Sequence, residues 1–196
     1  MKPSPIFTFP DMNLATILTI FRILLVPIFV LLILEGENNK ALGVFVVAGG
    51  TDLLDGWIAR RFKQQSSLGT ALDPLADKFL LVSSLLVLTW PGETTLARIP
   101  AWLTIVAISR DLLLIAGAVA VNWLKGIHTF PPSLGGKWAT LFQLMSVFSV
   151  LLINTGSNFP VPAGPIFVMT LALTVISGLH YLTRALHLGD FTGKRS

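Results

Sequence analysis

Four aspartates between positions 52 and 77 are the residues of this chain whose types and spacing could do chemistry. They stand in the pattern D-x2-D-G-x2-A-R-x8-G-x3-D-x3-D, which begins at Asp52 and ends at Asp77. Apolar residues dominate on both sides of the pattern. Ionisable side chains in or beside a membrane-spanning segment are unfavourable and usually functional. We therefore interpret the aspartates as a functional cluster and predict a metal site.

The spacing of the aspartates favours a shared site. Asp52 and Asp55 are three residues apart, and Asp73 and Asp77 are four apart, so each pair occupies one face of a helix. Carboxylates that converge at low dielectric repel one another unless cations or protons neutralise them. Hard divalent cations prefer oxygen ligands, and two such ions could be shared by four carboxylates. Mg²⁺ or Mn²⁺ would suit a phosphate substrate, because these ions keep coordination positions open for phosphate oxygens.

Small and basic residues inside the pattern fit a phosphate-binding role. Gly56 and Ala59 allow a ligand or a neighbouring helix to approach the backbone closely, and Gly69 relieves crowding before the next span. The guanidinium of Arg60 can hold a phosphate through two hydrogen bonds. The alternative to phosphate binding is that Arg60 serves only as a positively charged anchor that sets the membrane topology.

The elements that must position these residues are membrane-spanning helices. The chain has 196 residues, of which 53% are hydrophobic and 12% charged, which is too apolar for a soluble domain of this size. Its apolar runs are continuous, as in helices, and do not alternate as barrel strands do. We predict an all-α membrane protein, a single domain over residues 1–196, with six transmembrane helices: Leu14–Leu34, Ala41–Phe62, Ala71–Trp90, Ile99–Leu124, Leu134–Asn154 and Pro162–His187. Because the chain has no cysteine, disulfides, thiolate catalysis and cysteine-ligated zinc are excluded.

The distribution of charge predicts the orientation. If both termini are cytoplasmic, most basic residues lie on the cytoplasmic side and only Lys40 and Arg98 lie opposite, which follows the positive-inside rule. This orientation brings both aspartate pairs near the cytoplasmic face. Residues 1–13 fit either a segment along the membrane interface or a disordered segment.

The full pattern resembles the signature of the CDP-alcohol phosphatidyltransferases at each of its eight fixed positions. Leu18-Thr19-x2-Arg22 is similar to the L-T-x2-R of that family, and Pro132-Ser133-x2-Gly136-Lys137-x2-Thr140-x2-Gln143 resembles its later, acceptor-side segment. Six spans also agree with the family. One departure is Ala15-Thr16, which stands where Asn-Pro is often found in these enzymes.

The resemblance implies transfer of a phosphatidyl group from CDP-diacylglycerol to an alcohol, with release of CMP, in phospholipid biosynthesis. It implies two divalent ions on Asp52, Asp55, Asp73 and Asp77, with Asp77 also the general base. Gly56, Ala59, Arg60 and Gly69 would line the cytidine and diphosphate site. It further implies a homodimer in a bacterial-type inner membrane, with its active site near the cytoplasmic face and no nucleic-acid partner.

A second set of charges lies outside the signature. We expect Arg110 and Lys137 to bind an acidic acceptor, and Arg22 and Lys78 to balance the acidic cluster. An internal ion pair of Arg110 with a carboxylate of the cluster, and a membrane-surface anchor at Lys137, are the alternatives.

The acceptor expected from the resemblance is glycerol 3-phosphate. However, Ile108-Ser109-Arg110-Asp111 and Asp73-Pro74-Leu75-Ala76-Asp77-Lys78 also resemble CMP-forming cardiolipin synthases, for which phosphatidylglycerol would be the acceptor. Two other classes compete with this family. An ion transporter would give no reason for Gly56, Ala59, Arg60 and Gly69 at fixed offsets, and membrane prenyltransferases are larger bundles with differently spaced aspartates.

Overall fold

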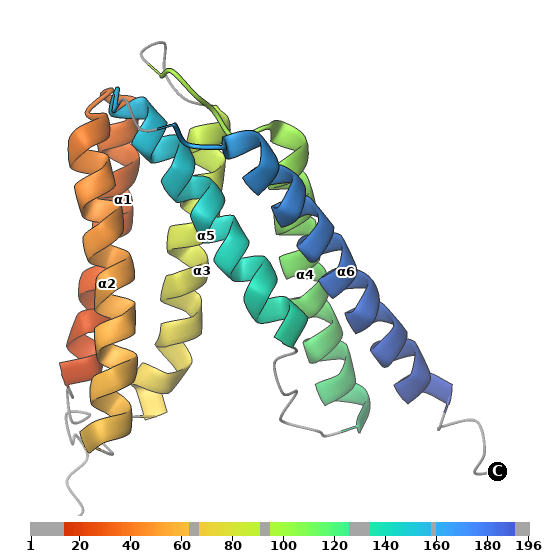
Figure 1. Ribbon diagram of the computed structural model, residues 1–196. Helices are drawn as coiled ribbons and strands as arrows, with labels where there is room; N and C mark the ends of the chain where they lie inside the picture. The colour runs from red at the N-terminus through yellow and green to blue at the C-terminus, as the bar shows by residue number, and fades with distance from the viewer. Residues whose placement is uncertain (1–13, 63–66, 91–94, 126–133, 158–159, 191–196) are drawn as a thin grey trace, which may run out of the picture. The chain divides into compact units, whose positions relative to one another are not determined.

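The computed structural model describes residues 14–62, 67–90, 95–125, 134–157 and 160–190. These residues form six helices (Figure 1): α1 Leu14–Leu34, α2 Asn38–Phe62, α3 Ser67–Thr89, α4 Ala101–Lys125, α5 Leu134–Asn154 and α6 Ala163–Asp190. The predicted bounds of α1 and α5 are confirmed. α2 and α3 begin a few residues earlier than predicted, because hydropathy marks an apolar span and a helix can extend beyond it through polar residues. The segment 1–13 lies outside the described residues.

The chain divides into two compact units, and the first covers Met1–Thr95. In this unit α1 packs against both α2 and α3. A stripe of fully buried side chains at helical spacing makes this contact on α1: Thr19, Arg22, Phe29 and Ile33. On α2 the stripe is Ala41, Phe45 and Ala48, and the rings of Phe29 and Phe45 lie 5.9 Å apart.

A tight turn at Gly36 sets α1 against α2. Gly36 has a φ of 76°, a left-handed conformation in which a side chain would be strained. Its N–H donates to the carbonyl of Ile33, and the N–H of Glu37 donates to that of Leu32. This pair of bonds is a Schellman motif, which satisfies the last carbonyls of the helix and reverses the chain.

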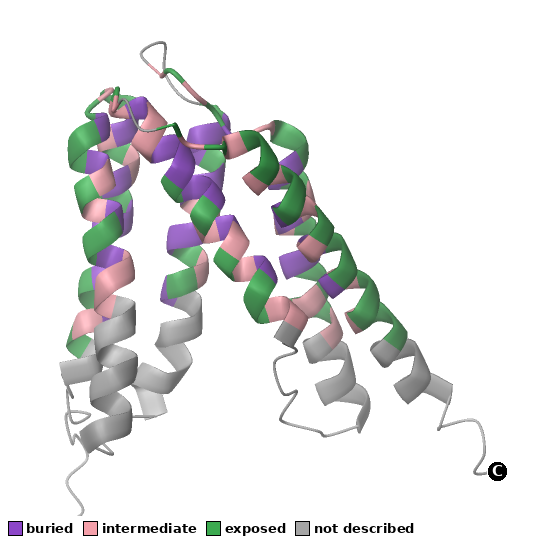
Figure 2. Cartoon of the chain, in the orientation of Figure 1, coloured by how far each residue is buried: buried purple, intermediate pink, exposed green. Residues whose placement is uncertain are grey.

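The second unit covers Leu96–Ser196, and in it α6 packs against both α4 and α5. The described side chains that α6 buries are all hydroxyl-bearing: Thr170, Thr174 and Ser177. Its outer face carries exposed apolar residues such as Val168 and Ile176 (Figure 2). Polar groups inside and apolar groups outside are what a helix needs when lipid, not water, surrounds the protein.

The described residues show that this is a membrane protein. Three stretches are long and apolar enough to cross a bilayer, namely Ile17–Leu34, Gly135–Asn154 and Ala163–Thr183. Large apolar side chains face outward on them, and Leu24 and Val168 are 60% and 63% exposed. The all-helical class and the six helices are thereby confirmed, and the crossing of the bilayer by all six stays a prediction.

Candidate functional site

Helices α2 and α3 carry all eight positions of the aspartate pattern. Asp52, Asp55, Gly56, Ala59 and Arg60 fall in α2, and Gly69, Asp73 and Asp77 fall in α3. The backbone is therefore helical at both aspartate pairs, as their spacing predicts, and both helices pack against α1. The side chains of residues 52–75 lie outside the described part of the structure. Of the four aspartates in the pattern, the structure therefore describes the side chain of Asp77.

Asp77 forms an ion pair with Arg22 of α1. The Nη1 of Arg22 donates to the Oδ1 of Asp77. The Arg22 side chain is 1% exposed and the Asp77 side chain 46% exposed. A buried guanidinium needs such a partner, because leaving its charge unpaired away from water is strongly unfavourable. The prediction that Arg22 balances the acidic cluster is confirmed for Asp77, and the same role for Lys78 stays a prediction.

The chemistry of the four aspartates fits the divalent ions that the resemblance implies. Carboxylate oxygens are the ligands that Mg²⁺ and Mn²⁺ prefer, and the half-exposed Asp77 can be reached by an ion or a substrate. Within the described part of the chain, no group of three or more histidine, cysteine, aspartate or glutamate residues could hold a metal ion. The side chains of Asp52, Asp55 and Asp73 lie outside that part.

Arg110 lies at the centre of a buried polar cluster in the second unit. Its Nη1 donates to the Oδ1 of Asp111 at 2.7 Å, and its Nη2 donates to the Oγ of Ser177 at 2.9 Å. Arg110 and Asp111 are each 7% exposed. The Nε of Arg110 is buried and has no hydrogen-bond partner among the described residues. Arg110 thus has an internal ion pair, but its partner is the neighbouring Asp111, which is not a carboxylate of the aspartate pattern. A pair of Arg110 with a carboxylate of the pattern stays a prediction.

Lys137 lies in the first turn of α5 and its side chain is exposed. It belongs to the same unit as Arg110, on a different helix. An exposed ammonium at a helix end is free to reach an anionic ligand or the membrane surface, so both predicted roles remain open to it.

A row of buried polar residues between α5 and α6 was not predicted. Ser146 and Thr170 share a hydrogen bond of 2.8 Å between their hydroxyl groups, and Thr170 also contacts the carbonyl of Phe142 at 3.0 Å. Gln143 and Thr174 are 0% exposed. The signal that could have revealed this row is the helical spacing of hydroxyl residues within an otherwise apolar α6.

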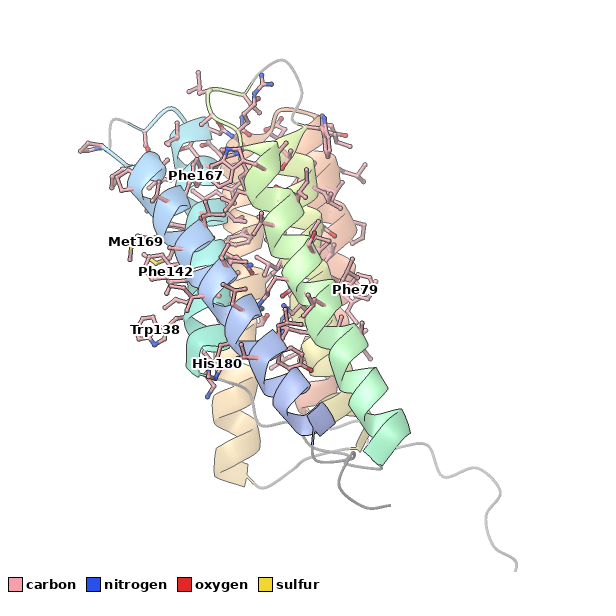
Figure 3. All side chains as sticks on the ribbon, turned by 90° about the vertical axis from the view of Figure 1, so that its right-hand side faces the viewer. Phe79, Trp138, Phe142, Phe167, Met169 and His180 are labelled. Carbon is pink, nitrogen blue, oxygen red and sulfur yellow. The ribbon has the colours of Figure 1, made fainter. Side chains whose placement is uncertain are left out.

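Three large side chains near this row point away from it. Figure 3 shows Trp138, Met169 and His180 on the outer side of α5 and α6. Trp138 is 55% exposed and Met169 49% exposed, and His180 is also exposed. Trp138 and His180 therefore suit contacts at the membrane surface better than packing in the core.

Comparison with known proteins agrees with this arrangement. The chain is 34% identical over 182 residues to the "Probable phosphatidylglycerophosphate synthase" of Mycobacterium tuberculosis. The aligned region covers 89% of this chain and 82% of that protein. It is 38% identical over 165 residues to the "Cardiolipin synthase (CMP-forming)" of Streptomyces coelicolor, covering 80% and 72%. It is 33% identical over 173 residues to the "CDP-diacylglycerol--glycerol-3-phosphate 3-phosphatidyltransferase" of Haemophilus influenzae, covering 87% and 91%.

The match to a family extends over both units. Residues 12–178 match the CDP-alcohol phosphatidyltransferases, a range that includes all four aspartates, Arg22 and the cluster around Arg110. With a transferase motif on α2 and α3 and apolar side chains facing outward, this chain belongs to the CDP-alcohol phosphatidyltransferase family, whose members act in phospholipid biosynthesis.

Proposed function

We propose that this protein transfers the phosphatidyl group of CDP-diacylglycerol to glycerol 3-phosphate and releases CMP at the cytoplasmic face of a bacterial-type inner membrane. The observation that carries the proposal is the family match over residues 12–178, which contains the complete aspartate pattern on α2 and α3. The relative from Haemophilus influenzae is named for this acceptor, and this chain covers 91% of it.

The reaction breaks one bond and forms one. The acceptor hydroxyl oxygen attacks the phosphorus that carries the diacylglycerol, and the bond from that phosphorus to the oxygen of the CMP phosphate breaks. CMP leaves with the electron pair of that bond. Asp77 accepts the proton of the attacking hydroxyl, which requires an accessible carboxylate. The 46% exposure of the Asp77 side chain supports this role.

The remaining motif residues bind and orient the donor. Asp52, Asp55, Asp73 and Asp77 would hold two divalent ions, which supply charge neutralisation for the diphosphate and for the leaving CMP. Gly56, Ala59, Arg60 and Gly69 line the cytidine and diphosphate site. Arg22 holds the carboxylate of Asp77 through its ion pair and so fixes its position on α3.

Arg110 and Lys137 bind the phosphate of the acceptor. Arg110 supports this role with a buried Nε that has no partner among the described residues, and Lys137 with an exposed ammonium. Replacing either by Gln removes a charge-assisted hydrogen bond worth about 1.5–3 kcal/mol, so the KM for the acceptor should rise about ten- to hundredfold. The KM for CDP-diacylglycerol should stay within about twofold. A raised KM for CDP-diacylglycerol with an unchanged KM for the acceptor would assign both residues to the donor site or to a structural role.

Phosphatidylglycerol is the second candidate acceptor. The Streptomyces relative named as a cardiolipin synthase is 38% identical to this chain. In addition, the pairing of Arg110 with Asp111 offsets part of the positive charge near the acceptor, which suits a head group with less negative charge than glycerol 3-phosphate.

One experiment distinguishes the candidates. Purified protein receives CDP-diacylglycerol and Mg²⁺ with glycerol 3-phosphate, phosphatidylglycerol, serine or inositol phosphate, and CMP and the lipid product are measured. We expect CMP and phosphatidylglycerophosphate with glycerol 3-phosphate. Cardiolipin formed only from phosphatidylglycerol would establish the second acceptor, and no CMP with any of the four acceptors would contradict the proposed function.

We also infer that the protein is a homodimer, as in the family that it resembles. Its mass in detergent, corrected for bound detergent, should be twice that of the 21.2 kDa chain. A mass of one chain at all protein concentrations would contradict this inference.

A further inference from the structure

The second unit contains buried polar atoms that no step of the proposed reaction uses. Gln143 on α5 and Thr174 on α6 are both 0% exposed. The amide nitrogen and oxygen of Gln143 and the hydroxyl of Thr174 have no hydrogen-bond partner among the described residues. Native proteins nearly always pair such groups with protein, water or a ligand, because an unpaired buried polar group is unfavourable. These atoms therefore need a partner that the described residues do not supply.

The two side chains lie at the same level of the helix pair. α5 and α6 are joined by a short connection between Asn154 and Ala163, so they run antiparallel. Ser146 and Thr170 are hydrogen-bonded across the pair. From that bond, Gln143 lies three residues back along α5 and Thr174 four residues forward along α6. Both steps are about one helical turn away from the connection, so the two residues face the same region.

This region adjoins the cluster around Arg110. Ser177 lies one turn beyond Thr174 on the same buried stripe of α6, and it accepts a hydrogen bond from Arg110 at 2.9 Å. The Arg110 side chain, whose Nε has no hydrogen-bond partner among the described residues, is held by this bond about one helical turn from Thr174. Its guanidinium is a charged donor, and the Thr174 hydroxyl and the Gln143 amide can both donate and accept hydrogen bonds. This combination suits a ligand that has a phosphate and a nearby hydroxyl group.

We propose that Gln143 and Thr174 bind the secondary hydroxyl of the acceptor alcohol and so contribute to acceptor specificity. This inference rests on the proposed function. Glycerol 3-phosphate and the head group of phosphatidylglycerol each carry a primary hydroxyl that can attack and a secondary hydroxyl that does not react. The amide oxygen of Gln143 accepts from that secondary hydroxyl, and its amide nitrogen or the Thr174 hydroxyl donates to it. A buried water offers the same chemistry, so the test must separate the two sources.

The test compares the acceptor with an analogue that lacks only the secondary hydroxyl. For glycerol 3-phosphate the analogue is 3-hydroxypropyl phosphate, and for phosphatidylglycerol it is the matching phosphatidyl-1,3-propanediol. The wild-type protein should prefer the natural acceptor about ten- to hundredfold in kcat/KM, because the analogue leaves buried polar groups unpaired. Gln143→Met and Thr174→Val should each reduce this ratio towards one and leave the KM for CDP-diacylglycerol unchanged.

Ser149→Ala is the matched control. Ser149 is buried on the same helix, but its hydroxyl is satisfied by the carbonyl of Ser146 at 2.9 Å. This variant should keep the wild-type ratio. Gln143→Met and Thr174→Val should melt at the wild-type temperature or above it, because each removes an unpaired buried group.

Three results would overturn the inference. A wild-type ratio near one, or variants that keep the wild-type ratio, would show that the acceptor hydroxyl does not reach these residues. Lower melting temperatures with unchanged ratios would assign the atoms to a structural water. If the wild-type protein turns over the natural acceptor and its analogue at equal rates, this inference alone is rejected. If the wild-type protein releases no CMP with any acceptor, the proposed function is rejected as well.

Discussion

At the scale of single residues, the ion pair between Arg22 and Asp77 is asymmetric. Arg22 is 1% exposed and Asp77 46% exposed. If the carboxylate is removed, the guanidinium keeps its buried position and loses a compensating charge. If the guanidinium is removed, the carboxylate can still be hydrated. Removing one partner of a buried pair is therefore more harmful than removing both.

We predict that Asp77→Asn lowers the free energy of unfolding by about 2–3 kcal/mol, and that adding Arg22→Met restores most of the loss. Both variants should lack CMP release, since neither has the proton acceptor. Unfolding in detergent measures the first effect and CMP release the second. Lys40→Gln, which breaks the exposed Lys40–Glu37 pair, should change stability little. A stable and active Asp77→Asn variant would contradict both roles of Asp77.

The metal prediction also belongs to single residues. CMP release should require Mg²⁺ or Mn²⁺, because clustered carboxylates and a diphosphate donor both need cationic neutralisation. Asp52→Asn, Asp55→Asn and Asp73→Asn should each abolish activity and weaken binding of Mn²⁺, measured by titration of the protein with Mn²⁺ alone. Full activity in excess chelator would contradict the prediction.

At the scale of helices, Gly117 of α4 lies against the ring of Tyr181 of α6. A Cβ at this position would lie 2.7 Å from the ring of Tyr181, inside any normal contact. The hydroxyl of Tyr181 donates to the carbonyl of Leu114 at 3.3 Å, which ties its ring to α4. The absent side chain of Gly117 thus lets the ring lie against the helix, and the same helix pair carries the Arg110–Ser177 bond.

Gly117→Ala should therefore lower the melting temperature, because the Tyr181 ring must move and its hydrogen bond must lengthen. Gly178→Ala is the control, since its Cβ would meet the Cγ of Arg110 at 3.7 Å, an ordinary contact. Alanine favours a helix over glycine by about 1 kcal/mol, so Gly178→Ala should be neutral or stabilising. Equal melting temperatures for the two variants would show that α4 and α6 do not pack closely at Gly117.

At the scale of the whole molecule, the surface is apolar and much of the core is polar. In the first unit Arg22 and Thr19 are buried while Leu24 and Leu31 are exposed, and in the second unit α6 repeats this arrangement. Lipid surrounding both units explains the pattern, because burying apolar groups gains little where the surroundings are equally apolar. Buried polar contacts and close packing then hold the helices together.

The cysteine-free chain allows a direct test of the predicted orientation. Asn39 lies in the first turn of α2 and Ser157 follows α5, and we predict both of these helix ends to be external. A membrane-impermeant thiol reagent should therefore label Asn39→Cys and Ser157→Cys in intact cells. Ser66→Cys, in a predicted cytoplasmic loop, should react only after the membrane is opened. Labelling of Ser66→Cys in intact cells would reverse the predicted orientation and move the active site to the other face.

The sequence alone determined the six helices and the transferase motif, because both depend on local information. The length of a continuous apolar run predicts a membrane-spanning helix. Spacings of three and four residues place the aspartates of each pair on one helix face. The bounds of α1 and α5 were predicted without error. The metal, donor and acceptor roles of the motif residues remain predictions that the family match supports.

Only the tertiary structure decided which buried polar groups meet. Arg22 and Asp77 are 55 residues apart in the chain, and Arg110 and Ser177 are 67 apart. The sequence predicted a cation near the acidic cluster, but not the Ser177 and Asp111 partners of Arg110 or the enclosure of Gln143. Such contacts depend on how each helix is rotated and where two helices cross. Those quantities are set by the packing of side chains from distant segments, such as Gly117 against Tyr181, and not by the periodicity of any one helix.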